Sequence, residues 1–137
     1  MIASYRRRMK HNMGNIYLVT ELVYRYMDFW TRLDNLIASK EIIIDRPKGT
    51  AHPKYPEILY PLDYGYLKDT AAGDGNEVNV WRDSRKDINL NALICTVDTM
   101  KNGTEIKLLV GCTEEEINIV NTLHNNEYMS GIVIKRR

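Results

Sequence analysis

Oxygen-bearing side chains gather in a glycine-rich stretch near the middle of the sequence. Asp74 lies between Gly73 and Gly75, and Asn76 and Asn79 follow it along the chain. Glycines permit positive φ angles and let a ligand come close to the backbone. Carboxylate and amide oxygens are the ligands that hard cations such as Mg²⁺ or Mn²⁺ prefer. The stretch therefore predicts a metal-binding loop, although the same residues are also typical of a solvated turn before an edge strand.

A second group with chemical potential lies at the end of a predicted hairpin. Two apolar runs, residues 90–97 and 105–110, are expected to pair because an Asn-Gly pair lies between them. Asp98 ends the first run, and the period-two rule places Glu105 and Lys107 on one face of the second. Two carboxylates and an ammonium group are therefore expected to converge there. Polar residues also collect at the ends of hairpins that bind nothing, so both interpretations stay open.

The elements around these residues can be predicted from their periodicity. Tyr64 and Tyr66 flank a glycine before the acidic loop, which we interpret as a tyrosine-rich turn. Residues 77–81 alternate polar and apolar side chains and predict a strand. Two further strands are predicted at residues 41–46 and 131–135.

Two helices are also predicted. Between residues 16 and 38 apolar residues recur at steps of three and four, the pattern of an amphipathic helix. We expect its aromatic stripe to pack on the sheet or against another copy of the chain. Thr113, followed three residues later by Glu116, predicts a capping box that begins a second helix.

Composition limits the classes of protein that fit. The 137 residues, 44% of them hydrophobic, predict a single domain at residues 15–137 after a loose basic tail at residues 1–14. A net charge of +1 creates no field that would select nucleic acid or an anionic membrane. No apolar run is long enough to span a bilayer, and the basic start lacks the apolar segment of a secretion signal. Both cysteines lie in apolar runs, so we expect reduced thiols in a cytoplasmic protein.

Several short motifs follow one another in the order found in the soluble family I inorganic pyrophosphatases. They are Ile44–Thr50, Lys54–Tyr55, Tyr60–Tyr66, Gly73–Gly75 and Glu105–Lys107. Over about residues 41–112 the chain resembles this family, and it is most similar to the shortened bacterial pyrophosphatase-like branch. The resemblance implies an α+β fold, mainly β, with an OB-like five-stranded β-barrel, an N-terminal amphipathic helix and a second helix near the C-terminus. It also implies Mg²⁺-dependent hydrolysis of pyrophosphate to two phosphates.

The resemblance further implies roles for individual residues. Those expected in catalysis are Asp45, Tyr64 and Lys107. Those expected to bind phosphate are Arg46, Lys48, Lys54, Tyr64 and Lys107, with Arg46 in place of an arginine from a β-hairpin that this chain lacks. Those expected to bind Mg²⁺ or Mn²⁺ are Asp74, Asp98 and Glu105. Cationic and phenolic donors suit a tetra-anionic substrate, because phosphoryl transfer depends mostly on positioning and electrostatics.

The chain departs from the family at two metal positions. Asn76 and Asn79 stand where the family has the second and third aspartates of its D-G-D-P-x-D signature. An amide offers an oxygen but contributes no charge and cannot take a proton. Two functions follow as alternatives: a slow pyrophosphatase, or a catalytically silent protein that binds a small phosphate compound or a protein partner. In either case we expect a homo-oligomer that binds neither nucleic acid nor membranes.

Overall fold

The computed structural model describes residues 28–83 and 89–137. The chain divides into two compact units, residues 1–32 and residues 33–137, and the fold described here is that of the second unit. The predicted tail at residues 1–14 lies outside the described residues, as does the predicted helix up to residue 27. What the structure describes of that helix is α3, which spans Phe29–Ala38.

Helix α3 begins after Asp28, whose Oδ1 accepts a hydrogen bond from the backbone N–H of Thr31 at 2.7 Å. Such an N-cap satisfies a donor that the first helical turn leaves without a partner. Within the second unit, both oxygens of Asp34 accept hydrogen bonds from Arg136, at 2.9 and 2.8 Å. This bidentate pair fixes the chain directly after the last strand.

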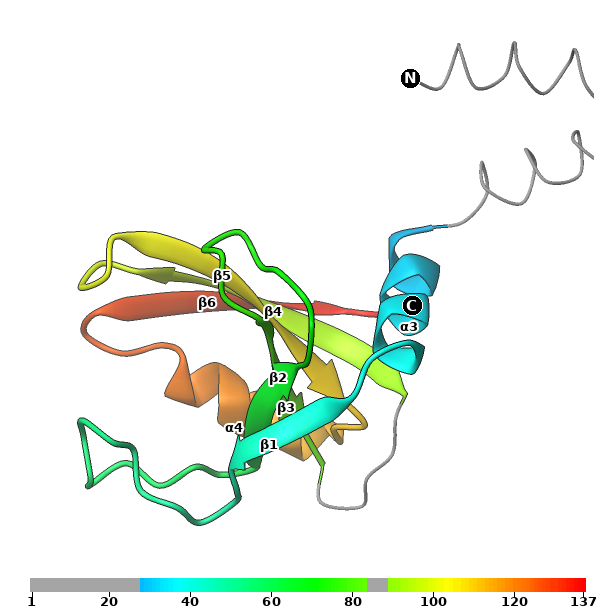
Figure 1. Ribbon diagram of the computed structural model, residues 1–137. Helices are drawn as coiled ribbons and strands as arrows, with labels where there is room; N and C mark the ends of the chain where they lie inside the picture. Colours follow the sequence, from blue (N-terminus) through cyan, green and yellow to red (C-terminus); the bar gives the residue numbers. More distant parts are fainter. Residues whose placement is uncertain (1–27, 84–88) are drawn as a thin grey trace, which may run out of the picture. The chain divides into compact units, whose positions relative to one another are not determined.

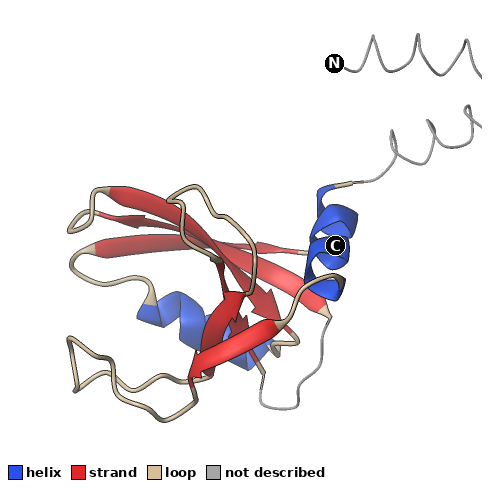
Figure 2. Cartoon of the chain, viewed as in Figure 1, coloured by secondary structure: helices blue, strands red, loops and turns tan. Residues whose placement is uncertain are grey.

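The second unit is built on a single sheet of six strands (Figures 1 and 2). Along the sheet the order is β1-β2-β3-β5-β4-β6, and all neighbours are antiparallel except β3 and β5. The strands are β1 (Ile42–Arg46), β2 (Asp63–Leu67), β3 (Val78–Arg82), β4 (Leu90–Asp98), β5 (Gly103–Val110) and β6 (Met129–Lys135). The mainly β class with two helices is confirmed. The described sheet has six strands rather than five, and β1 and β6 form its edges.

The additional strand is β2, which the sequence led us to expect as a turn. Gly65 lies in its middle, opposite Ile44 of β1. A Cβ atom at Gly65 would lie 1.8 Å from the backbone oxygen of Ile43, so only glycine allows β1 this close. The Tyr-Gly-Tyr motif is thus a strand interior shaped by its neighbour, and both phenols project from the same face.

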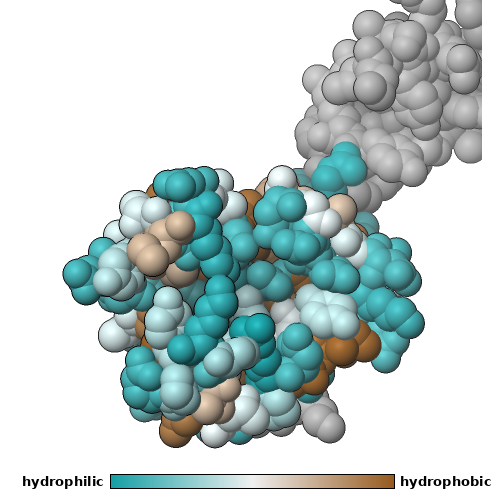
Figure 3. All heavy atoms as spheres, turned by 60° about the vertical axis from the view of Figure 1, so that its left-hand side comes forward, coloured by the Kyte–Doolittle hydropathy of each residue, from teal (hydrophilic) through white to brown (hydrophobic). Residues whose placement is uncertain are grey.

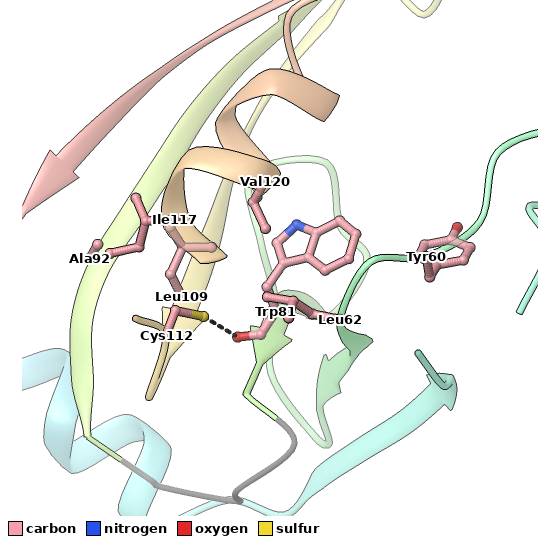
Figure 4. Close-up of a cluster of buried hydrophobic side chains, with 8 residues drawn as sticks. All are labelled: Tyr60, Leu62, Trp81, Ala92, Leu109, Cys112, Ile117 and Val120. Atoms are coloured by element: carbon pink, nitrogen blue, oxygen red, sulfur yellow. Dashed lines mark hydrogen bonds between the residues drawn. The ribbon is translucent and has the colours of Figure 1, made fainter. Parts of the chain in front are cut away.

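Helix α4 (Glu114–Leu123) begins at the predicted capping box. The Thr113 Oγ1 accepts from the backbone N–H of Glu116 at 3.2 Å, and the Glu116 carboxylate accepts from the N–H of Thr113 at 2.8 Å. Ile117 and Val120 point from α4 into a core on one face of the sheet (Figure 4). The buried members of this core are Tyr60, Leu62, Trp81, Ala92, Leu109, Cys112, Ile117 and Val120.

The surface agrees with the low hydropathy of the sequence. The face seen in Figure 3 is largely hydrophilic, with apolar side chains in small separate groups. Cys95 and Cys112 are free thiols, as expected. Among residues 28–83 and 89–137, neither helix has the length and apolar character needed to cross a bilayer.

Candidate functional site

Polar side chains from β1, β2, β3 and β5 project from one face of the sheet. Helix α4 packs on another part of the same face. In the strand register Arg46 lies opposite Tyr64, and Asn79 lies opposite Lys107. The pairing of β2 with β3 puts these two pairs on the same face. Glu105 lies two residues before Lys107 on β5, so it projects in the same direction. The register alone therefore brings five predicted site residues to one polar patch beside the core.

Lys107 is the centre of this patch. Its side chain is only 7% exposed, and its Nζ donates to the Glu105 Oε2 at 2.7 Å and to the Tyr64 hydroxyl at 2.9 Å. The ammonium also lies 5.3 Å from the centre of the Tyr64 ring. An ammonium group has three N–H donors. These two hydrogen bonds orient the group and leave it capacity for a further acceptor.

The charge state of the pair favours anion binding. Burial lowers the pKa of Lys107, but Tyr64 and Glu105 raise it by more, so the pKa lies above its usual value. Burial raises the pKa of Tyr64, and this outweighs the opposing effect of the Lys107 charge. At neutral pH the site therefore holds an ammonium group beside a neutral phenol.

A second cation reaches the same row of aromatic rings. Arg46 donates a hydrogen bond to the hydroxyl of Tyr60, and its guanidinium carbon lies 5.6 Å from the centre of that ring. The Tyr60 and Tyr64 rings stack with their centres 5.5 Å apart. Two stacked tyrosines thus lie between Arg46 and Lys107. Tyr60 is hydrogen-bonded to Arg46, and Tyr64 is hydrogen-bonded to Lys107.

The acidic loop between β2 and β3 approaches this patch. The Asp74 Oδ1 accepts from the backbone N–H of Asn76 at 3.0 Å, and its Oδ2 accepts from the Asn76 side-chain amide at 3.4 Å. The turn is completed by Gly75, whose φ is 84°. The hydrogen bond from the Asn76 backbone is the main cause that lowers the pKa of Asp74, and a side-chain interaction with Glu105 lowers it further. The acidic loop thus interacts with Glu105, the carboxylate partner of Lys107.

The oxygen donors here fit a hard cation held jointly by protein and phosphate. Two carboxylates, Asp74 and Glu105, are accompanied by the amides of Asn76 and Asn79. Nowhere in the described part of the chain do three His, Cys, Asp or Glu side chains form a potential metal cluster. Mg²⁺ needs only one or two protein carboxylates when substrate phosphates and water complete its shell. The donor set suits that arrangement and lacks the charge for a fully protein-bound ion.

The structure places other predicted site residues elsewhere. The Asp98 Oδ1 accepts from the backbone N–H groups of Met100 and Lys101, at 2.9 and 3.1 Å, and so stabilises the β4–β5 turn. Asp45 is exposed at the β-bulge between Ile44 and Arg46. Lys48 and Lys54 are exposed on the loop that joins β1 to β2. Contact of these four residues with metal or phosphate remains a prediction.

The residues that support Tyr64 from behind are not among the site residues predicted from the sequence. The Trp81 ring lies 4.6 Å from that of Tyr64, and its Nε1–H donates to the Nε2 of buried His124 at 3.1 Å. His124 is separated from Trp81 by 43 positions. Tyr60, which accepts a hydrogen bond from Arg46, lies inside the Tyr60–Tyr66 motif. Its place in that motif is the one sequence signal that could have assigned it to the site. Long-range pairs of this kind have no local pattern.

Comparison with known proteins identifies the fold. No protein-family model matches the chain, and no curated protein matches it significantly. The chain is similar to the structure of an inorganic pyrophosphatase from Helicobacter pylori, with 13% identity over 69% of this chain and 81% of that one and a TM-score of 0.50. It is also similar to an inorganic pyrophosphatase from Coxiella burnetii, with 13% identity, 69% and 82% coverage and a TM-score of 0.51. The resemblance noted in the motifs is thus confirmed at the level of the fold, which is that of the inorganic pyrophosphatases.

Proposed function

We propose that the protein binds pyrophosphate together with Mg²⁺ or Mn²⁺ and hydrolyses it to two phosphates. The observation that carries this proposal is the protonated, oriented Lys107, held by Tyr64 and Glu105 beside the loop of Asp74. Pyrophosphate is a compact polyanion, and its binding requires cationic and hydroxyl donors in fixed positions. The similarity to solved inorganic pyrophosphatases supports the same substrate class.

Each residue has a distinct role in this proposal. Lys107 exchanges its bond with Glu105 for a phosphate oxygen, and Arg46 neutralises charge at the other end of the tyrosine pair. The Tyr64 hydroxyl accepts a hydrogen bond from Lys107 and donates one through its own O–H to phosphate. Asp45, Lys48 and Lys54, and Asp98 as a metal ligand, stay in the proposal on the strength of the resemblance. A bound divalent ion would supply charge neutralisation and a water of lowered pKa.

The two asparagines predict slow turnover. Neither Asn76 nor Asn79 can accept a proton from an attacking water, and loss of a general base costs about 10²–10⁴ in rate. Each also lacks a charge that would attract the metal. An ion pair about 4 Å apart is worth about 4 kcal/mol at an effective dielectric constant of about 20, so even part of this loss weakens metal affinity about tenfold per site.

The test is release of phosphate from pyrophosphate with Mg²⁺ or Mn²⁺. We expect slow metal-dependent release by the wild type and at least about tenfold faster release by Asn76→Asp/Asn79→Asp at limiting metal. Lys107→Met should lose activity in both backgrounds. If neither the wild type nor the double variant releases phosphate, the proposed hydrolysis is wrong.

A catalytically silent binding protein is the second candidate, and the contacts of Asp74 favour it. Both of its oxygens accept hydrogen bonds from Asn76, so the loop is satisfied internally without a metal. Calorimetry separates the two functions, because binding of pyrophosphate without metal-dependent hydrolysis is expected only of the silent form. The expected homo-oligomer and cytoplasmic location remain predictions from the sequence.

A further inference from the structure

We propose that the phosphate compound recognised by this site is a nucleotide, such as a nucleoside diphosphate, whose base stacks on the exposed ring of Tyr55. Its phosphates would extend toward Arg46, the first cation along the row of rings that starts at Tyr55. This inference rests on the proposed function, because it uses the same phosphate-binding cations. It adds a subsite for a planar group, built on the loop between β1 and β2, which pyrophosphate itself would not occupy.

The ring of Tyr55 is exposed but its backbone is fixed. Tyr55 is 46% exposed, and its backbone N–H donates to the His52 Nδ1 at 3.3 Å. Its carbonyl accepts from the backbone N–H of Ile58 at 2.8 Å, and the backbone N–H of His52 donates to the carbonyl of Ile58 at 2.8 Å. A rigid aromatic side chain loses little conformational entropy when a ligand packs on it. Tyr55 is therefore preorganised for a planar group.

Ring contacts connect this platform with the phosphate-binding cations. The Tyr55 ring lies 5.2 Å from the His52 ring. His52 stacks on Tyr60 with ring centres 5.9 Å apart and planes inclined by 6°. Tyr60 accepts the hydrogen bond of Arg46 and stacks on Tyr64, the partner of Lys107. The aromatic row thus runs from an exposed platform to both cations.

Three cations and one carboxylate act on the ring of His52 beside the platform. His52 has a lowered pKa, first because of burial and then because Arg46, Lys101 and Lys54 are near, while Glu57 opposes this effect. These three cations come from β1, from the β4–β5 turn and from the platform loop itself. The imidazole stays neutral, since its Nδ1 accepts from the backbone N–H of Lys54 at 3.0 Å. Neutral rings bordered by cations suit a base attached to phosphates.

A mononucleotide fits these observations better than a nucleic-acid strand. The exposed platform consists of a single tyrosine, whereas single-strand binding uses successive stacking rings along a basic groove. A net charge of +1 gives little of the electrostatic attraction that a polyphosphate backbone requires. The ligand class is therefore one base and a short phosphate chain.

The test is calorimetric titration of the full chain with ADP and, separately, with pyrophosphate, both with Mg²⁺. We expect Tyr55→Ala to weaken ADP binding about tenfold, since stacking of a base on an aromatic ring is worth that much or more. Pyrophosphate affinity should not change. Tyr55→Phe should retain ADP affinity because it keeps the ring. Leu59→Ala is the matched control, since Leu59 lies on the same loop and is 58% exposed.

The outcomes distinguish this inference from the proposed function. Equal losses for ADP and pyrophosphate in Tyr55→Ala, or no loss for ADP, would overturn the nucleotide subsite while leaving phosphate binding intact. Tyr55→Leu, which retains apolar bulk, guards against loop distortion: an ADP affinity equal to the wild type would also overturn it. Binding of neither ligand by the wild type would remove the proposed function and this inference together. Salt-sensitive binding of a single-stranded oligonucleotide more tightly than ADP would overturn the choice of a mononucleotide.

Discussion

Lys107 and His124 are both buried, but their surroundings keep Lys107 positively charged and His124 neutral. Taken as whole residues, backbone included, Lys107 is 6% exposed and His124 is 7% exposed. Lys107 has Glu105 and the Tyr64 hydroxyl as partners, so its ammonium form is stabilised. His124 contacts the N–H of Trp81 and the sulfur of Met129, at 3.1 and 3.2 Å. Since neither contact stabilises a positive charge, His124 is neutral and its ring accepts the Trp81 hydrogen bond.

His124 should make the protein less stable in mild acid. Burial, and then the charge of Lys107, lower the pKa of His124 to about 4, whereas an unfolded histidine has a pKa of about 6.5. Below about pH 6.5 the unfolded chain therefore binds a proton that the folded chain does not. The stabilising contribution is complete above that pH and is lost as the pH falls towards about 4, at a cost of about 3 kcal/mol.

Urea unfolding measured between pH 7 and pH 4 tests this prediction. His124→Gln retains a side chain that can accept from Trp81 but does not titrate, so its unfolding free energy should vary less across this range. An equal pH dependence in the wild type and in His124→Gln would show that other groups cause it.

At the scale of the elements, the sequence predicts structure that depends on local signals and does not predict structure that depends on long-range contacts. The capping box of Thr113 and the Asn-Gly turn after β4 act within a few residues, and both elements formed as predicted. Strand β2 was missed because its Tyr-Gly-Tyr motif is locally typical of a turn. Position 65 requires glycine because the backbone of β1, about twenty residues earlier in the chain, leaves no room for a Cβ atom. No local pattern reports such a contact.

Gly65→Ala should separate β1 from β2 and destabilise the protein strongly. The added Cβ would lie 1.8 Å from the backbone oxygen of Ile43, which cannot move without shifting the strand. We expect a loss of at least about 3 kcal/mol in the free energy of unfolding. Gly73→Ala is the matched control, because a Cβ there meets nothing within 4 Å. It should change stability by no more than about 0.5 kcal/mol, and a similar effect of the two substitutions in chemical denaturation would refute the explanation.

At the scale of the whole molecule, the candidate site depends on four strands and two loops that meet only in the folded chain. The Glu105 and Lys107 spacing and the Asp74 loop could be predicted, since each is local. The approach of Tyr64 to Lys107 could not, because 43 positions separate them. The resemblance placed both in one site, and the sheet register supplies the physical cause. For the same reason, ligands that bridge these segments should stabilise the fold as a whole.

Metal and pyrophosphate together should raise the melting temperature more than the sum of their separate effects. On the proposed function, two carboxylates and two neutral amides bind a metal weakly by themselves, and Glu105 competes with phosphate for the Lys107 ammonium group. A metal beside Glu105 weakens that ion pair, so each ligand favours the other. A ligand at about 100 times its Kd stabilises by about 2.7 kcal/mol, which is a shift of about 5 °C or more for a chain of this size.

Thermal unfolding with a non-hydrolysable diphosphonate in place of pyrophosphate measures this coupling without turnover. Lys107→Met should lose the joint shift while retaining any small shift caused by metal alone, since its Asp74 and Glu105 carboxylates remain. Asn76→Asp/Asn79→Asp should enlarge the shift caused by metal alone, because it adds two charges to the loop. Strictly additive shifts in the wild type would mean that Glu105 does not link the two ligands, and the exchange of Glu105 for phosphate at Lys107 would then be wrong.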